Sequence, residues 1–431
     1  MRLRPFPPIT VADRLPGGRR ARRTRSRAAI ALAAALIPVT AAAPAPAVAT
    51  GSARAAFSNG TADGPADADP PFAETLTTDL VALMQRLRVP GAIVAVRTPQ
   101  WGTWIQTLGT ENLQSGAPIR AADHMRVGSI TKTFTGTVIL QLVQEGRLSL
   151  DDTVGSYLPD VPNGRNITIR QLLQMTSGLY NYSEDLEFNR ALDERPQTRY
   201  TPADLLKIAF AHDPYFAPGC GYHYSNTNTI LLGLLAEQLT GHPLAEEMQH
   251  RIFEPLGMHE TSMPSDGTVL PAPYAHGYEF INNVDSLTAP VLTEKDAAWA
   301  DWSAGNPKDV THVNASWTGA AGEAISTVGD ILRWAPALAN GDLLSPELQR
   351  ERLTFVPTTN PPSGLGYGLA IADFRGFLGH TGQISGYNSF EGHDPSLGAS
   401  VVVLVNTNQV PDGAAPVDQL TQLVIADAFH H

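Results

Sequence analysis

The sequence contains a single cysteine, Cys220, in 431 residues. An intramolecular disulfide is therefore excluded, and the fold has to rely on its hydrophobic core, for which the chain is long enough. Catalysis by a cysteine nucleophile is the alternative role for Cys220. That residue, however, follows Pro218-Gly219 in a predicted loop, and no histidine pattern of a cysteine protease accompanies it.

Several motifs of other hydrolases are also missing. The sequence has no His-Glu-x-x-His pattern, which disfavours a zinc protease, and no Gly-x-Ser-x-Gly, which disfavours an α/β-hydrolase. No internal repeat or heptad pattern is visible. Lysine is scarce, and the four lysines are Lys132, Lys207, Lys295 and Lys308.

The N-terminal segment has the pattern of a secretory signal. Nine arginines and one acidic residue, Asp13, precede an apolar run from Ala28 to Ala43, and small residues and prolines continue to Ala49. This order is typical of a signal peptide, here predicted over residues 1–49. Pro38 and the short run argue against a membrane span, which needs about 20 apolar residues, although a retained N-terminal anchor is the alternative. We therefore expect a secreted protein, extracellular or associated with the cell wall.

Negative charge dominates the rest of the chain. The full sequence carries a formal charge of −12. Residues 1–28 hold nine arginines and one aspartate, a net +8, and residues 29–49 are uncharged, so residues 50–431 carry −20. A field of this sign disfavours nucleic acid and anionic lipid as partners. We expect a monomer that acts on a small peptide or β-lactam.

Composition and periodicity divide the chain into parts. Residues 50–71 are rich in Gly, Ala, Ser, Asp and Pro and predict a flexible linker. The remainder, 72–431, predicts a sheet part at about 72–146 and 318–431 and a mostly helical part at about 147–317. The predicted helices are 72–87, 135–144, 169–173, 202–211, 228–239, 243–252, 327–338 and 417–429, and the predicted strands are 91–97, 102–109, 367–371, 377–379, 387–391 and 400–406.

The most informative stretch is Val127-Gly-Ser-Ile-Thr-Lys-Thr-Phe134, which places Ser129 three residues before Lys132. Helical periodicity follows, and residues i and i+3 of a helix share one face. A neutral lysine amine beside a serine hydroxyl can take its proton and make it a nucleophile. Ser-x-x-Lys alone is a weak signal, because an exposed helix start has the same pattern.

Two companion motifs follow downstream. Tyr224-Ser-Asn226 precedes a helical run, so the phenol can relay a proton and the Asn226 amide can hold a substrate, although an asparagine at a helix start also serves as a cap. His380-Thr-Gly382 lies in a predicted edge strand, which offers backbone groups to an extended substrate. The N–H groups of Ser129 and Gln383 can then form an oxyanion hole. A structural histidine is the alternative role for His380.

Together and in this order, the three motifs resemble those of the serine penicillin-recognising enzymes. These comprise D-alanyl-D-alanine carboxypeptidases, class C β-lactamases and related esterases. The resemblance covers about residues 72–431 and includes the stretches Gly146–Asp152, Ile167–Leu173, Thr176–Leu179 and Pro255–Met258. The histidine in the third motif is most similar to the actinobacterial carboxypeptidase branch.

The resemblance implies an α+β fold of the β-lactamase/transpeptidase type. It consists of an antiparallel sheet flanked by helices plus an all-helical subdomain, with the active site between them. No metal or organic cofactor is implied. By match to the family motifs, the site residues are Ser129 as nucleophile, Lys132 as its base, Tyr224 as proton shuttle, Asn226 on the substrate amide, His380, Thr381 and Gly382 along the substrate, and Gln383 through its backbone.

The implied activity is removal of the terminal D-alanine from cell-wall peptides. Such a carboxypeptidase needs a cation for the substrate carboxylate, and Arg375 is the candidate, although it follows Gly366-Tyr-Gly-Leu369 late and after an aspartate. An esterase, a β-lactamase, a D-aminopeptidase or a slowly deacylating penicillin-binding sensor is the alternative. No Glu-x-x-Leu-Asn stretch supplies a deacylating carboxylate, which disfavours fast β-lactam turnover.

Overall fold

The computed structural model describes residues 50–51, 69–264, 267–288, 291–293, 296, 300, 307–359 and 365–429. The predicted signal, residues 1–49, lies outside the described residues, as does the predicted linker apart from 50–51 and 69–71. Across the ranges just given, no helix is both long and apolar enough to cross a bilayer.

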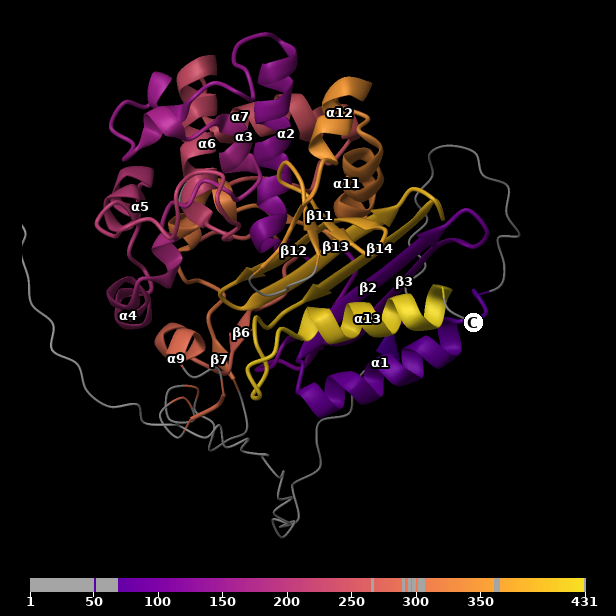
Figure 1. Ribbon diagram of the computed structural model, residues 1–431. Helices are drawn as coiled ribbons and strands as arrows, with labels where there is room; N and C mark the ends of the chain where they lie inside the picture. Colours follow the sequence, from indigo (N-terminus) through magenta and orange to yellow (C-terminus); the bar gives the residue numbers. More distant parts are fainter. Residues whose placement is uncertain are drawn as a thin grey trace, which may run out of the picture. The chain divides into compact units, whose positions relative to one another are not determined.

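A large antiparallel sheet forms one half of the fold, as Figure 1 shows. Its strands lie in the order β1 (Thr50–Gly51), β3 (Gly102–Asn112), β2 (Gly91–Thr98), β14 (Ala399–Val405), β13 (Tyr387–Asp394), β12 (Phe377–Ile384), β11 (Ala372–Phe374), β10 (Gly366–Tyr367) and β9 (Val356–Pro357), with β4 (Ala117–Pro118) on β3. Strand β2 pairs with β14, so the first hairpin lies beside the last strand, with Val94 opposite Val403.

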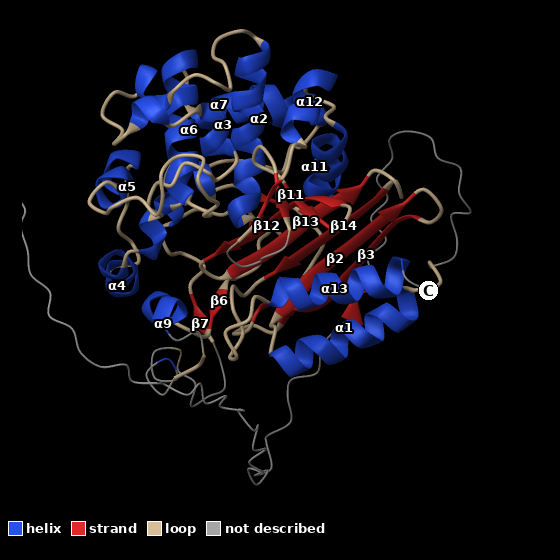
Figure 2. Ribbon diagram, viewed as in Figure 1, coloured by secondary structure: helices blue, strands red, loops and turns tan. Residues whose placement is uncertain are grey.

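Alternate residues of the central strands face two different cores, as the period of a strand requires. Val94 and Val403 face the core formed with helices α1 (Ala73–Leu87) and α13 (Pro416–Phe429). These two helices lie side by side over one face of the sheet (Figure 2). Val402 faces the opposite core, with α11 (Val328–Asn340) packed on that side of β13 and β14.

Helices make up most of the other half. They are α2 (Thr131–Gln144), α3 (Ile169–Leu173), α4 (Leu186–Glu194), α5 (Pro202–Ala209), α6 (Asn226–Thr240), α7 (Leu244–Met248), α8 (Glu254–Leu256), α9 (Asn283–Thr288) and α12 (Pro346–Arg352), and a π-helical turn, Gln249–Phe253, joins α7 to α8. The predicted fold class is confirmed. The helical part is not purely helical, however, because strands β6 (Tyr278–Glu279) and β7 (Lys308–Asp309) pair within it.

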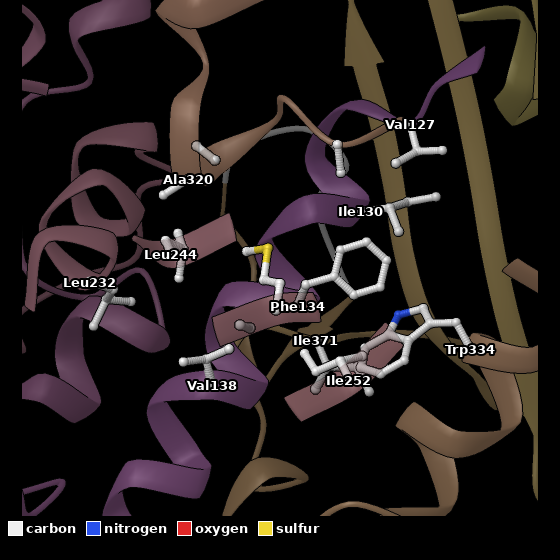
Figure 3. Close-up of a cluster of buried hydrophobic side chains, with 14 of the residues drawn as sticks. Val127, Ile130, Phe134, Val138, Leu232, Leu244, Ile252, Ala320, Trp334 and Ile371 are labelled. Carbon is white, nitrogen blue, oxygen red and sulfur yellow. The ribbon is translucent and has the colours of Figure 1, made fainter. Parts of the chain in front are cut away.

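Helix α2 runs through the centre of this half and is buried on almost every side. Figure 3 shows Phe134 and Trp334 facing one another in the surrounding core, with ring centroids 4.8 Å apart. The indole N–H of Trp334 also donates to the Thr133 hydroxyl at 2.9 Å. The first turn of α2 is therefore held firmly at the boundary between the two halves.

The predicted strand at 367–371 is wrong. After β10 the chain turns sharply, Ala370 adopts a left-handed φ of 56°, and only β11 resumes the sheet. The turn is stabilised from outside, because the Leu369 N–H donates to the Arg352 carbonyl and the Ala370 N–H to the Leu173 carbonyl, both at 2.9 Å. The apolar pattern indicated burial correctly, but burial here does not come with extended backbone.

Candidate active site

Ser129 lies in a short 3₁₀ turn, Gly128–Ile130, that leads directly into α2. Gly128 has a left-handed φ of 52°, and a β-carbon at this position would come within 2.7 Å of the Gln383 backbone nitrogen. Glycine is therefore required where the turn meets strand β12. The first N–H groups of a helix have no intrahelical partner, so this turn presents donors beside the Ser129 hydroxyl.

Lys132 is the immediate partner of Ser129. Its Nζ lies 2.9 Å from the Ser129 Oγ and 2.8 Å from the carbonyl oxygen of Ala321. The lysine is fully buried, and this burial lowers the pKa of its amine well below the ordinary value. A neutral amine donates to Ala321 and keeps a lone pair for the serine proton. The structure thus brings together the two residues that the sequence paired.

Tyr224 covers the same amine, which lies 4.8 Å from the centre of its ring. Burial raises the pKa of the Tyr224 phenol, a hydrogen bond with Ser129 opposes that shift, and nearby Tyr222 adds to it. The phenol is therefore protonated at neutral pH. It can donate a proton to a leaving group, and the Lys132 amine, with its lowered pKa, is the group able to accept the Ser129 proton.

Asn226, the first residue of α6, is held by hydrogen bonds to Asn181 and Ser183. The Asn226 N–H donates to the Asn181 Oδ1 at 3.0 Å, and the Asn226 Nδ2 donates to the Ser183 hydroxyl at 2.9 Å. That hydroxyl in turn donates to Asn181 Oδ1 at 3.0 Å. With its amide nitrogen fixed in this way, Asn226 has its carbonyl oxygen left to accept from a substrate N–H.

Strand β12 supplies the opposite wall. Strand β11 pairs only with Phe377–Gly379, and from His380 to Ile384 the pairing described for β12 is with β13 alone. The predicted substrate edge therefore begins at His380. Gly382 permits the close approach of the nucleophile turn, because a β-carbon there would lie 2.0 Å from the Val127 carbonyl oxygen.

His380 is buried and neutral. Burial and the Lys132 amine lower the pKa of the imidazole to about 3, with the Thr381 carbonyl acting in the opposite direction. Nδ1 lies 2.5 Å from that carbonyl oxygen, so it carries the proton, and Nε2 accepts from the Tyr367 hydroxyl at 3.0 Å. Both ring nitrogens are thus engaged, and His380 has neither charge nor free donor for a substrate carboxylate.

Residues 76–424 match the protein-family model described as Beta-lactamase. The chain belongs to the beta-lactamase family. Its described fold and the meeting of Ser129, Lys132 and Tyr224 agree with that membership. This beta-lactamase-family protein is therefore a serine hydrolase, of a family whose relatives include an esterase and amidases.

Three relatives of this beta-lactamase-family chain are informative. A D-stereospecific amidohydrolase from Streptomyces sp. is 33% identical, with a TM-score of 0.70 over 84% of this chain and 99% of its own. A D-amino acid amidase from Ochrobactrum anthropi SV3 is 26% identical, with a TM-score of 0.72 over 83% and 98%. Esterase EstB of Burkholderia gladioli is 29% identical over 76% and 88%. The chain spans only 62% and 61% of the length of two further curated relatives, from Bacillus subtilis and Staphylococcus aureus.

The structure does not bring Arg375 to the cluster of this beta-lactamase-family site. Arg375 is exposed in the turn between β11 and β12, six residues before Thr381. Strand β12 begins at Phe377, four residues before Thr381, so at about 3.3 Å per residue the strand alone separates the Arg375 turn from Thr381 by roughly 13 Å. Cys220 is exposed and free in the loop before Tyr224. No group of three His, Cys, Asp or Glu side chains within the described ranges could hold a metal ion.

Three supporting residues escaped the sequence reasoning. Tyr367, which orients His380, begins the predicted strand 367–371, and no motif of the sequence gives it a role at the site. Asn181 and Ser183, which hold Asn226, lie in a loop with no motif of their own. These contacts join residues distant in sequence, so spacing within one motif could not reveal them.

Proposed function

We propose that this beta-lactamase-family hydrolase cleaves amide and ester bonds on the carboxyl side of a D-amino acid residue through an acyl-enzyme on Ser129. The observation that carries the proposal is the 2.9 Å contact between the Ser129 Oγ and the buried Lys132 amine, whose pKa burial lowers well below its ordinary value. The preference for a D-residue is supported by the likeness to the D-stereospecific amidohydrolase and the D-amino acid amidase.

Acylation follows from the positions of the polar atoms. Lys132 takes the proton of the Ser129 hydroxyl as its Oγ attacks the substrate carbonyl carbon. The developing oxyanion lies between the backbone N–H groups of Ser129 and Gln383. Tyr224 donates its proton to the leaving nitrogen and recovers one from the Lys132 ammonium, so the C–N bond breaks without expelling an amide anion.

Deacylation reverses the same proton path. A water molecule takes the place of the leaving amine and loses a proton toward Tyr224 and Lys132 while it attacks the ester carbonyl. Ser129 then leaves as an alcohol with a proton returned from Lys132. The same residues serve both steps. This route suits a small leaving group, which departs and makes room for water, better than a β-lactam, whose leaving nitrogen stays attached to the acyl group.

The leaving group of the proposed substrate is uncharged. His380 has both nitrogens engaged, and Arg375 lies at the far end of the β11–β12 turn. Neither of these two residues therefore offers a charged partner to a free carboxylate on the leaving group. Primary amides and esters of D-amino acids are accordingly the preferred class.

A D-alanyl-D-alanine carboxypeptidase is the second candidate. The observation in its favour is the free strand edge that starts at His380, which suits an extended peptide, together with the hydroxyl of Thr381 next to it. In this reading Thr381 alone binds the carboxylate. The two candidates differ in a measurable way, because only the second gains from a carboxylate on the leaving residue.

The test compares four substrates with the purified protein: D-phenylalanine amide, L-phenylalanine amide, D-alanine 4-nitroanilide and diacetyl-L-Lys-D-Ala-D-Ala. We expect hydrolysis of the two D-configured simple amides to exceed that of the tripeptide in kcat/KM, and the L-amide to be a poor substrate. D-alanine release from the tripeptide at a higher kcat/KM would establish the carboxypeptidase instead.

A Ser129→Ala variant provides the control. It should lose all activity, and the wild-type protein should gain the mass of a penicillin on Ser129 when incubated with a slow-turnover penicillin. If the variant kept full activity on any of the four substrates, or if L- and D-amides were cleaved equally well, the proposal would be wrong.

Export and a monomeric state are part of the proposal. The basic and apolar pattern of residues 1–49 supports cleavage of a signal near Ala49, so the protein recovered from culture medium should begin close to residue 50. Light scattering on the purified protein should give the mass of one chain. Recovery of an uncleaved chain with the membrane fraction would favour a retained anchor.

A further inference from the structure

A cavity of about 290 Å³ opens beside the C-terminal end of β12. Ser385, the residue after β12, lines this Ser385 cavity and lies two residues beyond Gln383. At about 3.3 Å per extended residue, Ser385 is roughly 7 Å from Gln383, whose N–H belongs to the proposed oxyanion hole. Trp317, also in the lining, leads within four residues to Ala321, whose carbonyl binds Lys132. Two lining residues are therefore linked to the site by short stretches of chain.

The proton donor fixes which half of a substrate faces this cavity. Tyr224 has to reach the leaving group, and its ring lies 6.1 Å from that of His380, at the near end of the free strand edge. With the carbonyl oxygen at Gln383, the leaving group lies toward His380. The acyl half then continues along β12 in the opposite direction, toward Ser385.

The lining of the Ser385 cavity combines apolar and charged side chains. The apolar side chains are Leu192, Pro196, Val310, Val313 and Trp317. The charged ones are Asp193, Glu279, Asp309 and Lys308, and His312 lies with them. Three carboxylates against one lysine attract a cation, while the apolar side chains suit methylene groups.

Glu279 is the most deeply buried of these three acids. It is 2% exposed, its Oε1 accepts from the Asn408 amide at 3.0 Å, and it is hydrogen-bonded to the Ser385 hydroxyl. Burial and the nearby Asp193 raise the pKa of its carboxyl to about 7. A cation bound beside it would favour the ionised form, so binding would relieve the cost of this buried acid.

Neighbouring groups hold the other two acids in place. Asp193 accepts from the backbone and side-chain amides of Asn283 at 2.9 and 2.7 Å. Asp309 contacts His276 at 2.7 Å and accepts from the Thr311 N–H at 2.9 Å. Both carboxylates are therefore preorganised, and a ligand cation would meet fixed charges rather than mobile side chains.

We infer that the Ser385 cavity is an acyl-side subsite for substrates whose acyl half carries an ammonium group on a flexible chain of about lysine length, such as D-lysyl amides. The inference rests on the proposed function for the direction of the substrate. The methylene stem of such a chain follows β12 toward Ser385, and its ammonium, roughly 7 Å from the scissile carbonyl, reaches the Glu279 carboxyl that is hydrogen-bonded to the Ser385 hydroxyl.

The test uses a matched pair of substrates, D-lysine 4-nitroanilide and D-norleucine 4-nitroanilide, which differ in the side-chain ammonium. We expect the wild-type protein to prefer the lysine compound by about tenfold or more in kcat/KM, mainly through KM. Glu279→Gln should lower this ratio about tenfold, and Lys308→Gln, which removes the competing cation, should raise it. Glu246→Gln, an exposed acid outside the cavity, serves as the control variant and should leave the ratio unchanged.

The outcomes separate this inference from the proposed function. Equal or better hydrolysis of the norleucine compound, or a ratio that neither Glu279→Gln nor Lys308→Gln alters, would overturn the subsite. If no D-aminoacyl anilide is cleaved, the proposed function fails, and the pair of 6-aminohexanoyl and heptanoyl 4-nitrophenyl esters tests the cavity by itself. A preference for the heptanoyl ester in that experiment would overturn the inference.

Discussion

The carbonyl oxygen of Val127 occupies the place that a side chain at Gly382 would need. A β-carbon on residue 382 would lie 2.0 Å from that oxygen and 2.3 Å from the Ser389 hydroxyl, which itself donates to the same carbonyl at 2.8 Å. The nucleophile turn and the substrate strand thus touch backbone to backbone. This contact sets the gap between Ser129 and Gln383, in which the carbonyl of a substrate has to fit.

Gly382→Ala should disable the enzyme. The added methyl forces β12 away from Val127, and a shift of about 1 Å in an active site costs on the order of a hundredfold in rate. We expect kcat/KM to fall at least that far and the unfolding free energy to fall by roughly 2–4 kcal/mol. Gly102→Ala is the control, because it strains a left-handed turn with open space around it and lies in a distant hairpin. Equal activity losses in the two variants would contradict a role for this contact.

Lys132→Met should remove activity while preserving the fold. Methionine fills similar space without a base, so kcat/KM should drop by about a hundredfold to ten-thousandfold. In the wild-type enzyme, protonation of the amine blocks proton transfer, so activity should decline as pH falls through its lowered pKa. A pH–rate profile measured with a D-aminoacyl anilide checks this. A profile flat between roughly pH 4 and 8 would exclude Lys132 as the base.

Tyr224→Phe should affect amides far more than activated esters. The variant keeps the ring over Lys132 but loses the proton for the leaving group. An amine cannot leave without that proton, whereas 4-nitrophenolate can, so the loss should be about a hundredfold greater for a D-aminoacyl anilide than for the matching 4-nitrophenyl ester. Parallel kinetics on the two compounds measure this difference. Equal losses would indicate that Tyr224 only shapes the site.

The buried His380 should make stability depend on pH. The unfolded imidazole gains a proton below about pH 6.5, but the folded one gains it only near pH 3, because burial lowers its pKa. The unfolded state therefore binds more protons between these limits, and stability should fall as the pH falls, by at most about 1.4 kcal/mol per unit. Urea unfolding at pH 7.5 and 5.5 measures the slope. His380→Gln, which can still accept from Tyr367, should flatten it, and an unchanged slope would contradict the assignment.

Local periodicity predicted helices that bury one face and strands with a regular apolar pattern. Ser129 and Lys132 could be placed together from sequence because three residues make almost one helical turn, and the structure has them 2.9 Å apart. The order of the three motifs predicted the fold class through a family resemblance. Burial lowers the pKa of Lys132 and depends on contacts with Tyr224 and Ala321. Because both residues are far away in the chain, the local sequence pattern could not predict this burial.

Non-local contacts explain what the sequence left out. The turn after Tyr367 exists because Arg352 and Leu173 accept its N–H groups, and nothing in the apolar run itself indicates those partners. Arg375 follows that turn. A single straight strand over 367–371 would place Arg375 differently, so the sequence did not predict its distance from the site. The two residues that hold Asn226 come from a loop some forty positions earlier.

The pairing of β2 with β14 has a consequence for when the enzyme can fold during its synthesis. Val94 finds its neighbour Val403 only when nearly the whole chain has been synthesised, and closing so long a loop is slow. A growing chain that has not yet reached residue 377 already carries Ser129 and Lys132, but it lacks the strand that offers Gln383. We therefore expect hydrolytic activity only after β12 has been synthesised, and a chain truncated before residue 377 should be inactive.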